Sequence, residues 1–275
     1  MKLNKGRIFA YLVLVLGVIS MIIPFLWMLL TSFMTDVQIF SYPPKFIPKP
    51  FIVDNYINVA DNMPIARYFS NSLVVATLTT IGQVLFASMA GFAFAKLNFK
   101  FKEPLFLIIL ATMMIPPQVN IIPLFYIMKE LHWIDTFQAL ILPGLFGAFG
   151  VFLMRQWFKT IPNALLESAK IDGCNWLQIF FKIAFPLALP AIATLAIFTF
   201  ITTWNGFMWP LIVTNSDSIK TLPVALASFK GSFRETIQWG QLMACSVITT
   251  IPAVAIFLLG QKYFIKGLMD AGVKE

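Results

Sequence analysis

The sequence predicts an all-α integral membrane protein with six transmembrane helices, and its composition and its uncharged runs predict this fold class. Hydrophobic residues make up 59% of the 275 residues and charged residues only 12%, and the mean hydropathy is +0.82. In a typical soluble domain about 25% of all residues are charged. The chain also lacks the runs of about ten alternating polar and apolar residues that are typical of a membrane-spanning barrel.

Six uncharged runs are each about as long as a membrane-spanning helix. A hydrocarbon core of roughly 30 Å requires about 20 helical residues, and a helix satisfies its backbone hydrogen bonds within its own segment. The first run follows Lys2, Lys5 and Arg7 and is too long for a signal-peptide core of about 7–15 residues, so we interpret it as a retained helix. The runs are residues 8–35, 68–95, 104–128, 136–154, 183–215 and 236–261.

The distribution of basic residues predicts the orientation of the six helices. With the N-terminus in the cytoplasm, the inside segments hold thirteen Lys and Arg residues and the outside segments seven, of 20 in the chain. Cationic loops remain in the cytoplasm, so we expect a multi-pass membrane protein with both termini cytoplasmic. The net charge of +8 then reflects topology and gives no reason to expect nucleic acid as a partner.

Two other classes of membrane protein fit the sequence less well. An ion-coupled transporter commonly places acidic residues inside its spans, and the six runs contain none. An intramembrane enzyme needs a set such as His with carboxylates, and the chain has one histidine, His132, in a short outside loop. Cys174 and Cys245 have neither disulfide nor metal-site spacing. We therefore expect no catalytic and no metal site.

The uncharged runs divide the chain into three parts. Residues 1–69 comprise the first helix and an outside proline-rich segment, with a short amphipathic helix expected near residues 53–59. Residues 70–262 form a core of five helices that includes a long loop, 155–182, and residues 263–275 form a cytoplasmic tail. Nine prolines lie inside the spans. They either kink helices that must rearrange or reflect the general frequency of proline in membrane helices.

The long cytoplasmic loop has the sequence features of a short helix, a sharp bend and a second helix. Pro162 suits the first turn of a helix, and residues 164–170 are good helix formers. Gly173 can adopt the left-handed conformation that ends a helix. Asn175 can cap a second helix that leads into the fifth span. The loop is too polar to enter lipid, so we expect it to lie across the cytoplasmic face.

The short helix is predicted to present a docking face. Leu166, Ala169 and Gly173 recur at helical spacing and form a small apolar side. Glu167, next to it, could pair with a basic group on a partner and fix the register of the contact. The alternative interpretation is an ordinary amphipathic helix on the cytoplasmic surface.

This loop resembles the cytoplasmic motif of bacterial ABC-importer permeases, usually written E-A-A-x3-G-x9-I-x-L-P. The chain departs from the motif at Ser168, which is small enough for close packing, and at Phe185, which replaces the leucine. The matching residues are Glu167, Ala169, Gly173, Ile183 and Pro186.

The resemblance implies a type I ABC importer permease fold in which this loop is the coupling helix that docks on an ATP-hydrolysing subunit. The chain has no phosphate-binding G-x4-G-K-[ST] loop, so it should bind no cofactor, and ATP and Mg should sit on the partner. By the resemblance, the residues at the ATPase contact are Leu166, Glu167, Ser168, Ala169, Asp172 and Gly173.

Three further stretches resemble carbohydrate-importer permeases similar to the smaller subunit of the maltose permease. They begin at Met114, at Trp204 and at Gln261, and the last implies a tail that reaches between two ATPase subunits through Gly267, Gly272 and Lys274. The resemblance also implies three kinds of partner: a second permease in a heterodimer, a dimer of ATP-binding subunits and an extracytoplasmic solute-binding protein.

Polar residues in the third and fifth spans are the candidates for a substrate path. Such residues usually face a bundle interior or a transport path, although they also serve as interhelical hydrogen bonds. Uncharged spans favour a neutral ligand, and the resemblance implies a sugar or oligosaccharide. The alternatives are a polyol, a glycerol-phosphate-like solute or a stand-alone secondary transporter. The candidates are Gln118, Asn120, Thr202, Thr203, Trp204 and Asn205.

Overall fold

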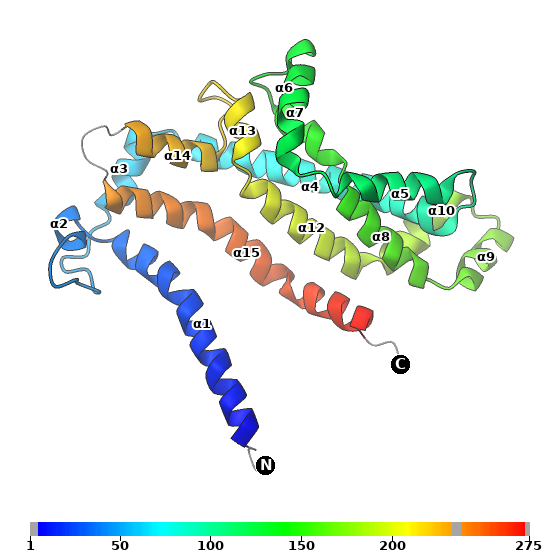
Figure 1. The fold of residues 1–275 in the computed structure, drawn as a ribbon, viewed down its shortest axis with the longest axis horizontal. Helices are drawn as coiled ribbons and strands as arrows, with labels where there is room; N and C mark the ends of the chain where they lie inside the picture. The colour runs from blue at the N-terminus through cyan, green and yellow to red at the C-terminus, as the bar shows by residue number, and fades with distance from the viewer. Residues whose placement is uncertain (1–4, 233–237, 273–275) are drawn as a thin grey trace. The chain divides into compact units, whose positions relative to one another are not determined.

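The computed structural model describes residues 5–232 and 238–272, and these ranges contain helices and loops but no strand (Figure 1). They form two compact units, Met1–Arg67 with Ala225–Ile251, and Tyr68–Val224 with Pro252–Glu275. Four helical segments are long and apolar enough to cross a membrane, and two bent helix pairs bring the number to six. The predicted all-α membrane fold is confirmed.

The first unit is built around the C-terminal end of α1. It contains α1 (Lys5–Thr31), α2 (Asp36–Ile39), α3 (Asp54–Asn62) and the adjoining parts of α14 (Leu222–Ser232) and α15 (Trp239–Gly272). The apolar side chains of α1 are exposed along its span, as expected for a lipid-facing helix.

The amphipathic helix expected near residues 53–59 is α3, and it holds the end of α1 in place. The buried Asn55 amide donates hydrogen bonds to the carbonyls of Ser32 and Met34, both at 2.9 Å. A Cβ at Gly240 would lie 2.5 Å from the same amide, so only glycine lets α15 approach this closely.

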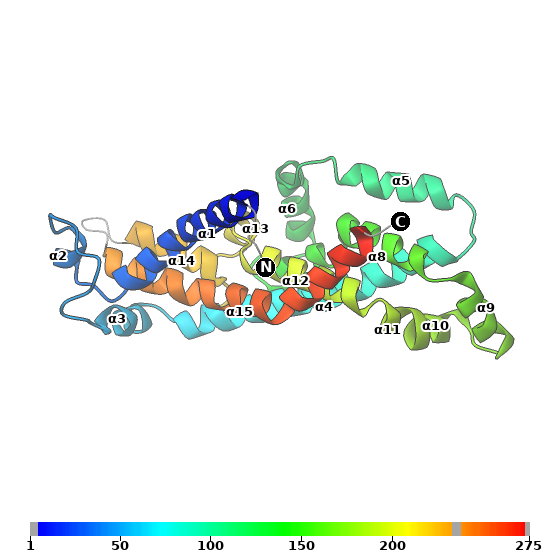
Figure 2. The same cartoon turned by 90° about the horizontal axis from the view of Figure 1, so that it is seen from below.

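The second unit carries the remaining helices, and α9 lies at one extreme of it beyond α8 and α10 (Figure 2). In chain order its elements are α4 (Ile65–Lys96), α5 (Lys102–Thr112), η1 (Pro117–Asn120), α6 (Ile121–Glu130), α7 (Phe137–Ile141), η2 (Leu142–Leu145), α8 (Ala148–Thr160), α9 (Asn163–Ile171), α10 (Trp176–Ile179), η3 (Phe180–Ala184), α11 (Phe185–Leu187), α12 (Leu189–Trp204) and α13 (Met208–Val213).

Two of the six expected spans are broken into bent helix pairs. The third span bends by 92° between α5 and η1, and the fifth by 79° between α11 and α12. Pro116 and Pro117 lie at the first break, and Pro186 and Pro190 flank the second. Each proline removes a backbone donor and its ring clashes with the preceding turn. A π-helical turn, η3, precedes Pro186 and marks the same irregularity.

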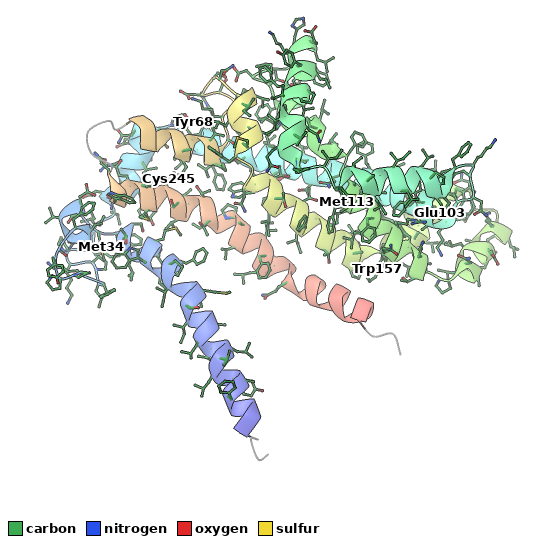
Figure 3. All side chains as sticks on the ribbon, viewed as in Figure 1. Met34, Tyr68, Glu103, Met113, Trp157 and Cys245 are labelled. Carbon is green, nitrogen blue, oxygen red and sulfur yellow. The ribbon has the colours of Figure 1, made fainter. Side chains whose placement is uncertain are left out.

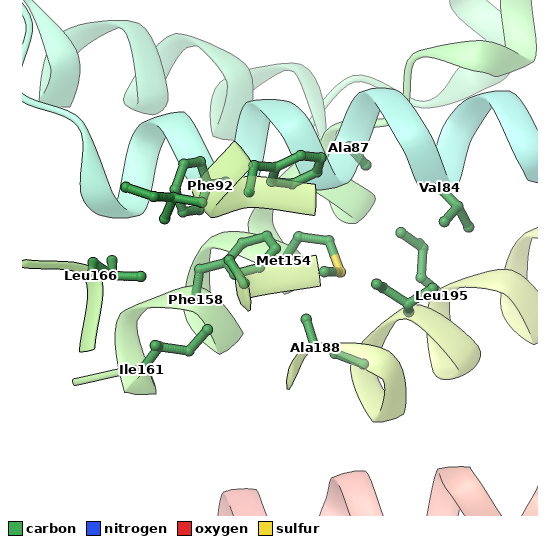
Figure 4. Packing of buried hydrophobic residues seen from close by; sticks show 14 of the residues in the cluster. Val84, Ala87, Phe92, Met154, Phe158, Ile161, Leu166, Ala188 and Leu195 are labelled. Atoms are coloured by element: carbon green, nitrogen blue, oxygen red, sulfur yellow. The ribbon is translucent and has the colours of Figure 1, made fainter. Parts of the chain in front are cut away.

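The main core of the second unit lies between α4, α8 and α12. Figure 4 shows Met154 of α8 with Phe92 of α4 on one side and Leu195 of α12 on the other. Gly91 permits this packing, because a Cβ there would lie 2.6 Å from the Met154 Cβ. Small residues at a crossing let membrane helices gain close van der Waals contact. This core continues directly into the base of α9, where it includes Ile161.

Candidate coupling site and transport path

The bend after α9 is built as the sequence predicted. Gly173 has φ +83°, the left-handed conformation that glycine adopts without steric cost. The N–H of Cys174 donates to the carbonyl of Ala169, and the N–H of Gly173 donates to that of Lys170, both at 3.0 Å. These two bonds form a Schellman motif, which satisfies the free carbonyls at the end of α9.

The helix that follows the bend is capped by Asn175, as predicted. The Asn175 side chain accepts the N–H of Gln178 at 2.9 Å, and the Gln178 side chain accepts the N–H of Asn175 at 2.9 Å. This reciprocal capping box satisfies two donors that would otherwise lack a partner. Both sides of the bend are therefore fixed by backbone-directed hydrogen bonds, so α9 is a defined projection.

The predicted docking face of α9 points the other way, which corrects the expectation for its apolar side. Leu166 and Ala169 are only 4% and 6% exposed, and they belong to the core of their own chain. An amphipathic helix buries its apolar stripe against the nearest core, so this stripe cannot also meet a partner. The exposed residues of the predicted set are Glu167, Ser168, Asp172 and Gly173.

Ile171 is an exposed residue of α9 that the sequence analysis did not select. Its side chain is 86% exposed, although it is large and apolar. It directly precedes Asp172 at the tip of the bend. The sequence did not select it because it lies five residues after Leu166, which places it off the apolar stripe of the helix. Its exposure became apparent only from the structure. The exposed tip therefore combines two carboxylates with one apolar side chain.

Lys96 ties the last turn of α4 to the start of α9. Its ammonium donates to the carbonyl of Ile161 at 2.5 Å and to the side-chain oxygen of Asn163 at 2.8 Å. A cavity of about 530 Å³ opens beside this link, between the end of α4 and α9. Its lining includes Glu167 and Lys170, and the Lys170 ammonium lies 3.8 Å from the centre of the Trp176 ring. A cation over an indole face is an attractive contact.

Arg155 is a buried charge that sequence reasoning placed in the loop. The helix α8 extends through Thr160, so the loop begins at Ile161 and not at Arg155. The guanidinium pairs with Glu103 at the start of α5 at 2.5 Å, and it donates to the carbonyl of Phe94 at 3.2 Å (Figure 3 labels Glu103). The helical spacing of Met154 and Phe158 with earlier apolar residues was the sequence pattern that could have extended the helix.

The contacts of Arg155 offset the free-energy cost of burying its charge. The residue is 4% exposed, and its guanidinium lies 3.8 Å from the centre of the Phe106 ring. A buried charge is tolerated when it is paired and its donors are satisfied. Through this one side chain, α8 is bonded to both α4 and α5.

The predicted substrate-path residues are distributed over two elements. Gln118 and Asn120 are exposed in η1, at the 92° break. Asn205 is exposed at the end of α12, Thr202 is also exposed, and Thr203 is half-buried.

Trp204 differs from the other substrate-path candidates because it is 1% exposed. Its ring lies nearly parallel to Phe200, with centroids 5.9 Å apart, and meets Phe69 edge-on at 5.4 Å. A ring enclosed in this way has no face free for a ligand, which corrects its assignment as a substrate contact. Trp204 instead packs the end of α12 next to Asn205.

The tail residues can be described only in part. Gly267 and Gly272 lie in the backbone of α15, which continues through Gly272, and Lys274 lies outside the described residues.

At the other end of α4, polar side chains fix the loop that follows α13. The Asp135 carboxylate accepts the N–H groups of Asn215 at 2.8 Å and Ser216 at 3.0 Å. The Asn71 amide donates to the carbonyls of Ser218 and Lys220, both at 2.9 Å. Partial burial raises the pKa of Asp135, but the hydrogen bonds from Ser216 and Asn215 and the charge of Lys220 lower it by more. Its pKa therefore lies below the ordinary value.

The geometry of the chain is similar to that of solved transporter subunits. A chain of a bacterial ABC transporter involved in the import of the acidic polysaccharide alginate superimposes with a TM-score of 0.85 and 23% identity, over 96% of this chain and 99% of the other. A chain from the alginate transporter in complex with an alginate pentasaccharide-bound periplasmic protein gives a TM-score of 0.66 at 15% identity. At these identities the likeness establishes the fold alone, which is that of these transporter chains.

Sequence comparisons give closer relatives. The chain is 33% identical over 270 residues to the sn-glycerol-3-phosphate transport system permease protein UgpE of Yersinia enterocolitica, covering 96% of each chain. It is 39% identical over 228 residues to the arabinooligosaccharides transport system permease protein AraQ of Bacillus subtilis, covering 82% of this chain and 80% of the relative. Residues 83–270 match the family described as binding-protein-dependent transport system inner membrane component. The chain therefore belongs to this family of inner-membrane transport permeases.

Proposed function

We propose that this chain is a permease subunit of an ATP-driven importer and that α9 is its coupling helix. The observation that carries the proposal is the construction of α9. Its apolar stripe is locked into the core through Leu166 and Ala169, and both flanks of its bend are hydrogen-bonded. A force applied to the exposed tip, at Glu167, Asp172 and Gly173, would pass to the core with little loss.

The ATP-hydrolysing partner is proposed to bind this exposed tip. Glu167 and Asp172 would pair with basic groups on the partner, because ion pairs with good geometry fix the register of a contact. Ile171, 86% exposed, would supply an apolar contact between them. Ser168 and Gly173 are small enough to let the partner surface approach, and the tail around Gly267, Gly272 and Lys274 would make a second contact.

The rest of the assembly follows from the family and the sequence. The proposed transporter pairs this chain with a second permease in a heterodimer, two ATP-binding subunits and an extracytoplasmic solute-binding protein. ATP and Mg would be bound by the partner, because this chain has no phosphate-binding G-x4-G-K-[ST] loop. The excess of basic residues in alternate loops supports a cytoplasmic α9 and cytoplasmic termini. ATP binding would supply the differential affinity that shifts the permease between inward- and outward-facing states.

The proposed cargo is a sugar or an oligosaccharide, with a glycerol-phosphate-like solute as the second candidate. Relatives named for arabinooligosaccharide and for sn-glycerol-3-phosphate transport support one candidate each. The buried Arg155 does not favour a charged cargo, because its charge is already paired with Glu103. The exposed amides of Gln118, Asn120 and Asn205 are suited to hydroxyl-rich ligands, since an amide both donates and accepts.

The coupling assignment is tested in the complete transporter with two α9 variants. Glu167→Lys and Gly173→Asp should lower both co-purification of the ATPase and solute uptake by at least about tenfold, a loss of 1.4 kcal/mol in the contact. Asp61→Lys, a charge reversal at another exposed carboxylate, at the end of α3, is the matched control and should retain both. Wild-type uptake and ATPase binding in both α9 variants would contradict the proposal.

The cargo is tested on the cognate solute-binding protein. Calorimetry with arabino-oligosaccharides and with glycerol 3-phosphate, under the same conditions, should give binding with the oligosaccharides only. Binding of glycerol 3-phosphate alone would replace the first candidate by the second.

A further inference from the structure

Residues 37–53, which begin inside α2 and end just before α3, expose an unusual set of large apolar side chains. Beyond α2 they form a proline-rich stretch without regular structure, and they belong to the first unit. A water-facing loop would carry polar side chains in most of these positions. The exposed fractions are Val37 83%, Phe40 66%, Tyr42 96%, Phe46 67%, Ile47 67% and Phe51 60%.

This segment is held in one conformation by its own hydrogen bonds and ring contacts. The Gln38 side chain donates to the carbonyl of Pro50 at 3.2 Å, and the N–H of Ile52 donates to the carbonyl of Phe33 at 3.1 Å. The rings of Phe33 and Phe51 stack with centroids 4.4 Å apart. The apolar side chains are therefore displayed by a fixed backbone, and their exposure is a property of the fold.

A ring contact places the segment at the level of the membrane boundary. Phe46 meets Trp27 edge-on, with centroids 5.7 Å apart. Trp27 precedes Thr31, the end of the first membrane span, by four residues, or about 6 Å at 1.5 Å per residue. Phe46 therefore lies close to the end of a candidate membrane span whose apolar side chains are exposed. Tryptophan and tyrosine are enriched at this depth in membrane proteins, where one end of the ring is apolar and the other wet.

The charges of the segment complement a lipid surface. Lys45 and Lys49 are exposed, and residues 37–53 contain no Asp or Glu. Neither lysine takes part in an ion pair within the described part of the chain. Long lysine side chains can keep their stems in apolar surroundings and extend the ammonium to phosphate groups.

We propose that residues 37–53, together with Trp27, form an interfacial anchor that binds the bilayer surface. The apolar side chains would lie at the boundary between headgroups and acyl chains, and Lys45 and Lys49 would bind the phosphates of anionic lipids. This surface continues the lipid-facing surface of α1 through the contact between Trp27 and Phe46. The anchor fixes the depth of α1 in the membrane, and it adds a lipid-binding site to the proposed transport role.

The anchor is tested by locating one side chain relative to lipid. In the full-length chain, Cys174→Ser and Cys245→Ala remove the native thiols, and Ile47→Cys carries an environment-sensitive fluorophore. Ile47 is suitable because it is 67% exposed and leaves the Trp27–Phe46 contact intact. In nanodiscs of phosphatidylcholine and phosphatidylglycerol, spin-labelled lipid should quench the fluorophore at least about twofold, more with the label near the headgroup than at the acyl end.

A matched position and a lysine variant complete the experiment. Asp61→Cys, also exposed and in the same unit, should be quenched little. Spin-labelled phosphatidylglycerol should quench position 47 several-fold more than spin-labelled phosphatidylcholine, since each lysine near an anionic surface attracts it by about 1 kcal/mol. The double variant Lys45→Gln and Lys49→Gln should abolish that preference and retain quenching by the neutral lipid.

Three results would overturn the proposal or its lysine contact. Equal, weak quenching at positions 47 and 61 would place the segment in water. Loss of quenching at position 47 when the complete transporter is assembled would show that a partner protein covers the segment. Quenching without any preference for phosphatidylglycerol would overturn the phosphate contact of the two lysines.

Discussion

The two ends of α4 hold neighbouring backbone segments with side chains of different charge. Asn71 and Lys96 are 25 residues apart along the same helix, or about 37 Å. At the α9 end, cations from α4, α5 and α8 donate to backbone carbonyls: Lys96 to Ile161, Lys102 to Leu97 at 2.9 Å, and Arg155 to Phe94. At the α13 end, the neutral amide of Asn71 donates to carbonyls, and the carboxylate of Asp135 accepts backbone N–H groups.

The difference shows that polar side chains can fix a loop with or without making stability depend on a buried charge. A cation near the C-terminal carbonyls of a helix also interacts favourably with the helix dipole. The α9 end uses this advantage and buries Arg155, so its stability depends on an ion pair. The α13 end relies on a neutral amide and on a carboxylate that stays close to solvent. We therefore expect substitution of the buried ion pair at the α9 end to have the largest effect on stability. We also expect the two partners, Arg155 and Glu103, to differ in the stability that their substitution costs.

The largest effect is expected from Glu103→Ala. This change leaves the buried Arg155 without its carboxylate, although Phe94 and the Phe106 ring remain, and it should cost about 2–3 kcal/mol of stability. Arg155→Met should cost less, because the Glu103 side chain is 64% exposed and stays solvated. Thermal unfolding of the purified chain in one detergent measures both.

The exposed ion pair at the α13 end is the control for this prediction. Lys220 and Asp217 are 2.7 Å apart, and the Asp217 side chain is 63% exposed. Asp217→Ala should cost less than about 0.5 kcal/mol, as is usual for surface pairs. Equal losses in Glu103→Ala and Arg155→Met would contradict the asymmetry and with it the assignment of a buried charge.

The next effect is expected from Asn71→Ala, which removes two hydrogen bonds at the α13 end. At about 0.5–1.5 kcal/mol for each bond, the loss should be about 1–3 kcal/mol. Hydrogen–deuterium exchange of residues 214–221 should rise, while that of residues 161–175 stays unchanged. Asn71→Asp should be at least as damaging, because a carboxylate cannot donate to the carbonyls of Ser218 and Lys220. Faster exchange in both segments would show that the two ends are not independent.

Local features of the α9 end could be predicted from sequence because neighbouring residues determine them. The left-handed Gly173 and the cap at Asn175 depend on a few consecutive residues. The uncharged runs were sufficient to predict the six spans for a similar reason. In lipid, every spanning segment must satisfy its own backbone hydrogen bonds. The direction of the apolar stripe of α9 was predicted wrongly, because periodicity identifies a stripe but not the surface that covers it.

Features that depend on distant residues were missed. The partner of Arg155 is Glu103, 52 residues away, and no local pattern indicates their contact. The sequence left open whether the prolines inside the spans kink their helices, and Pro24 and Pro252 lie inside the unbroken helices α1 and α15. Within the described residues, the sharp breaks occur only in the third and fifth spans. Which proline breaks a helix is decided by the packing around it, which a single sequence does not contain.

A smaller effect is expected from Gly173→Ala at the α9 end. An alanine at φ +83° is strained by about 1 kcal/mol, and no neighbouring atom lies within 4 Å of its Cβ, so backbone strain is the whole effect. Hydrogen–deuterium exchange of residues 163–179 should report a local loosening of α9. Gly173→Asn should be milder, because asparagine tolerates the left-handed conformation better. A large fall in global stability would instead indicate that the bend supports the core.

The smallest effect is expected from Asp135 at the α13 end, and it should depend on pH. The pKa of Asp135 is lowered in the folded chain, so its stabilising contribution is present above the ordinary value of 3.8 and is lost as the pH falls through the lower, folded pKa. Asp135→Asn should therefore lower the Tm slightly at pH 7, by about 1–2 °C, because the group is close to solvent. The difference from the wild type should shrink towards pH 3. A difference that grows as the pH falls would reverse the sign of the Asp135 contribution and remove this carboxylate from the account of the α13 end.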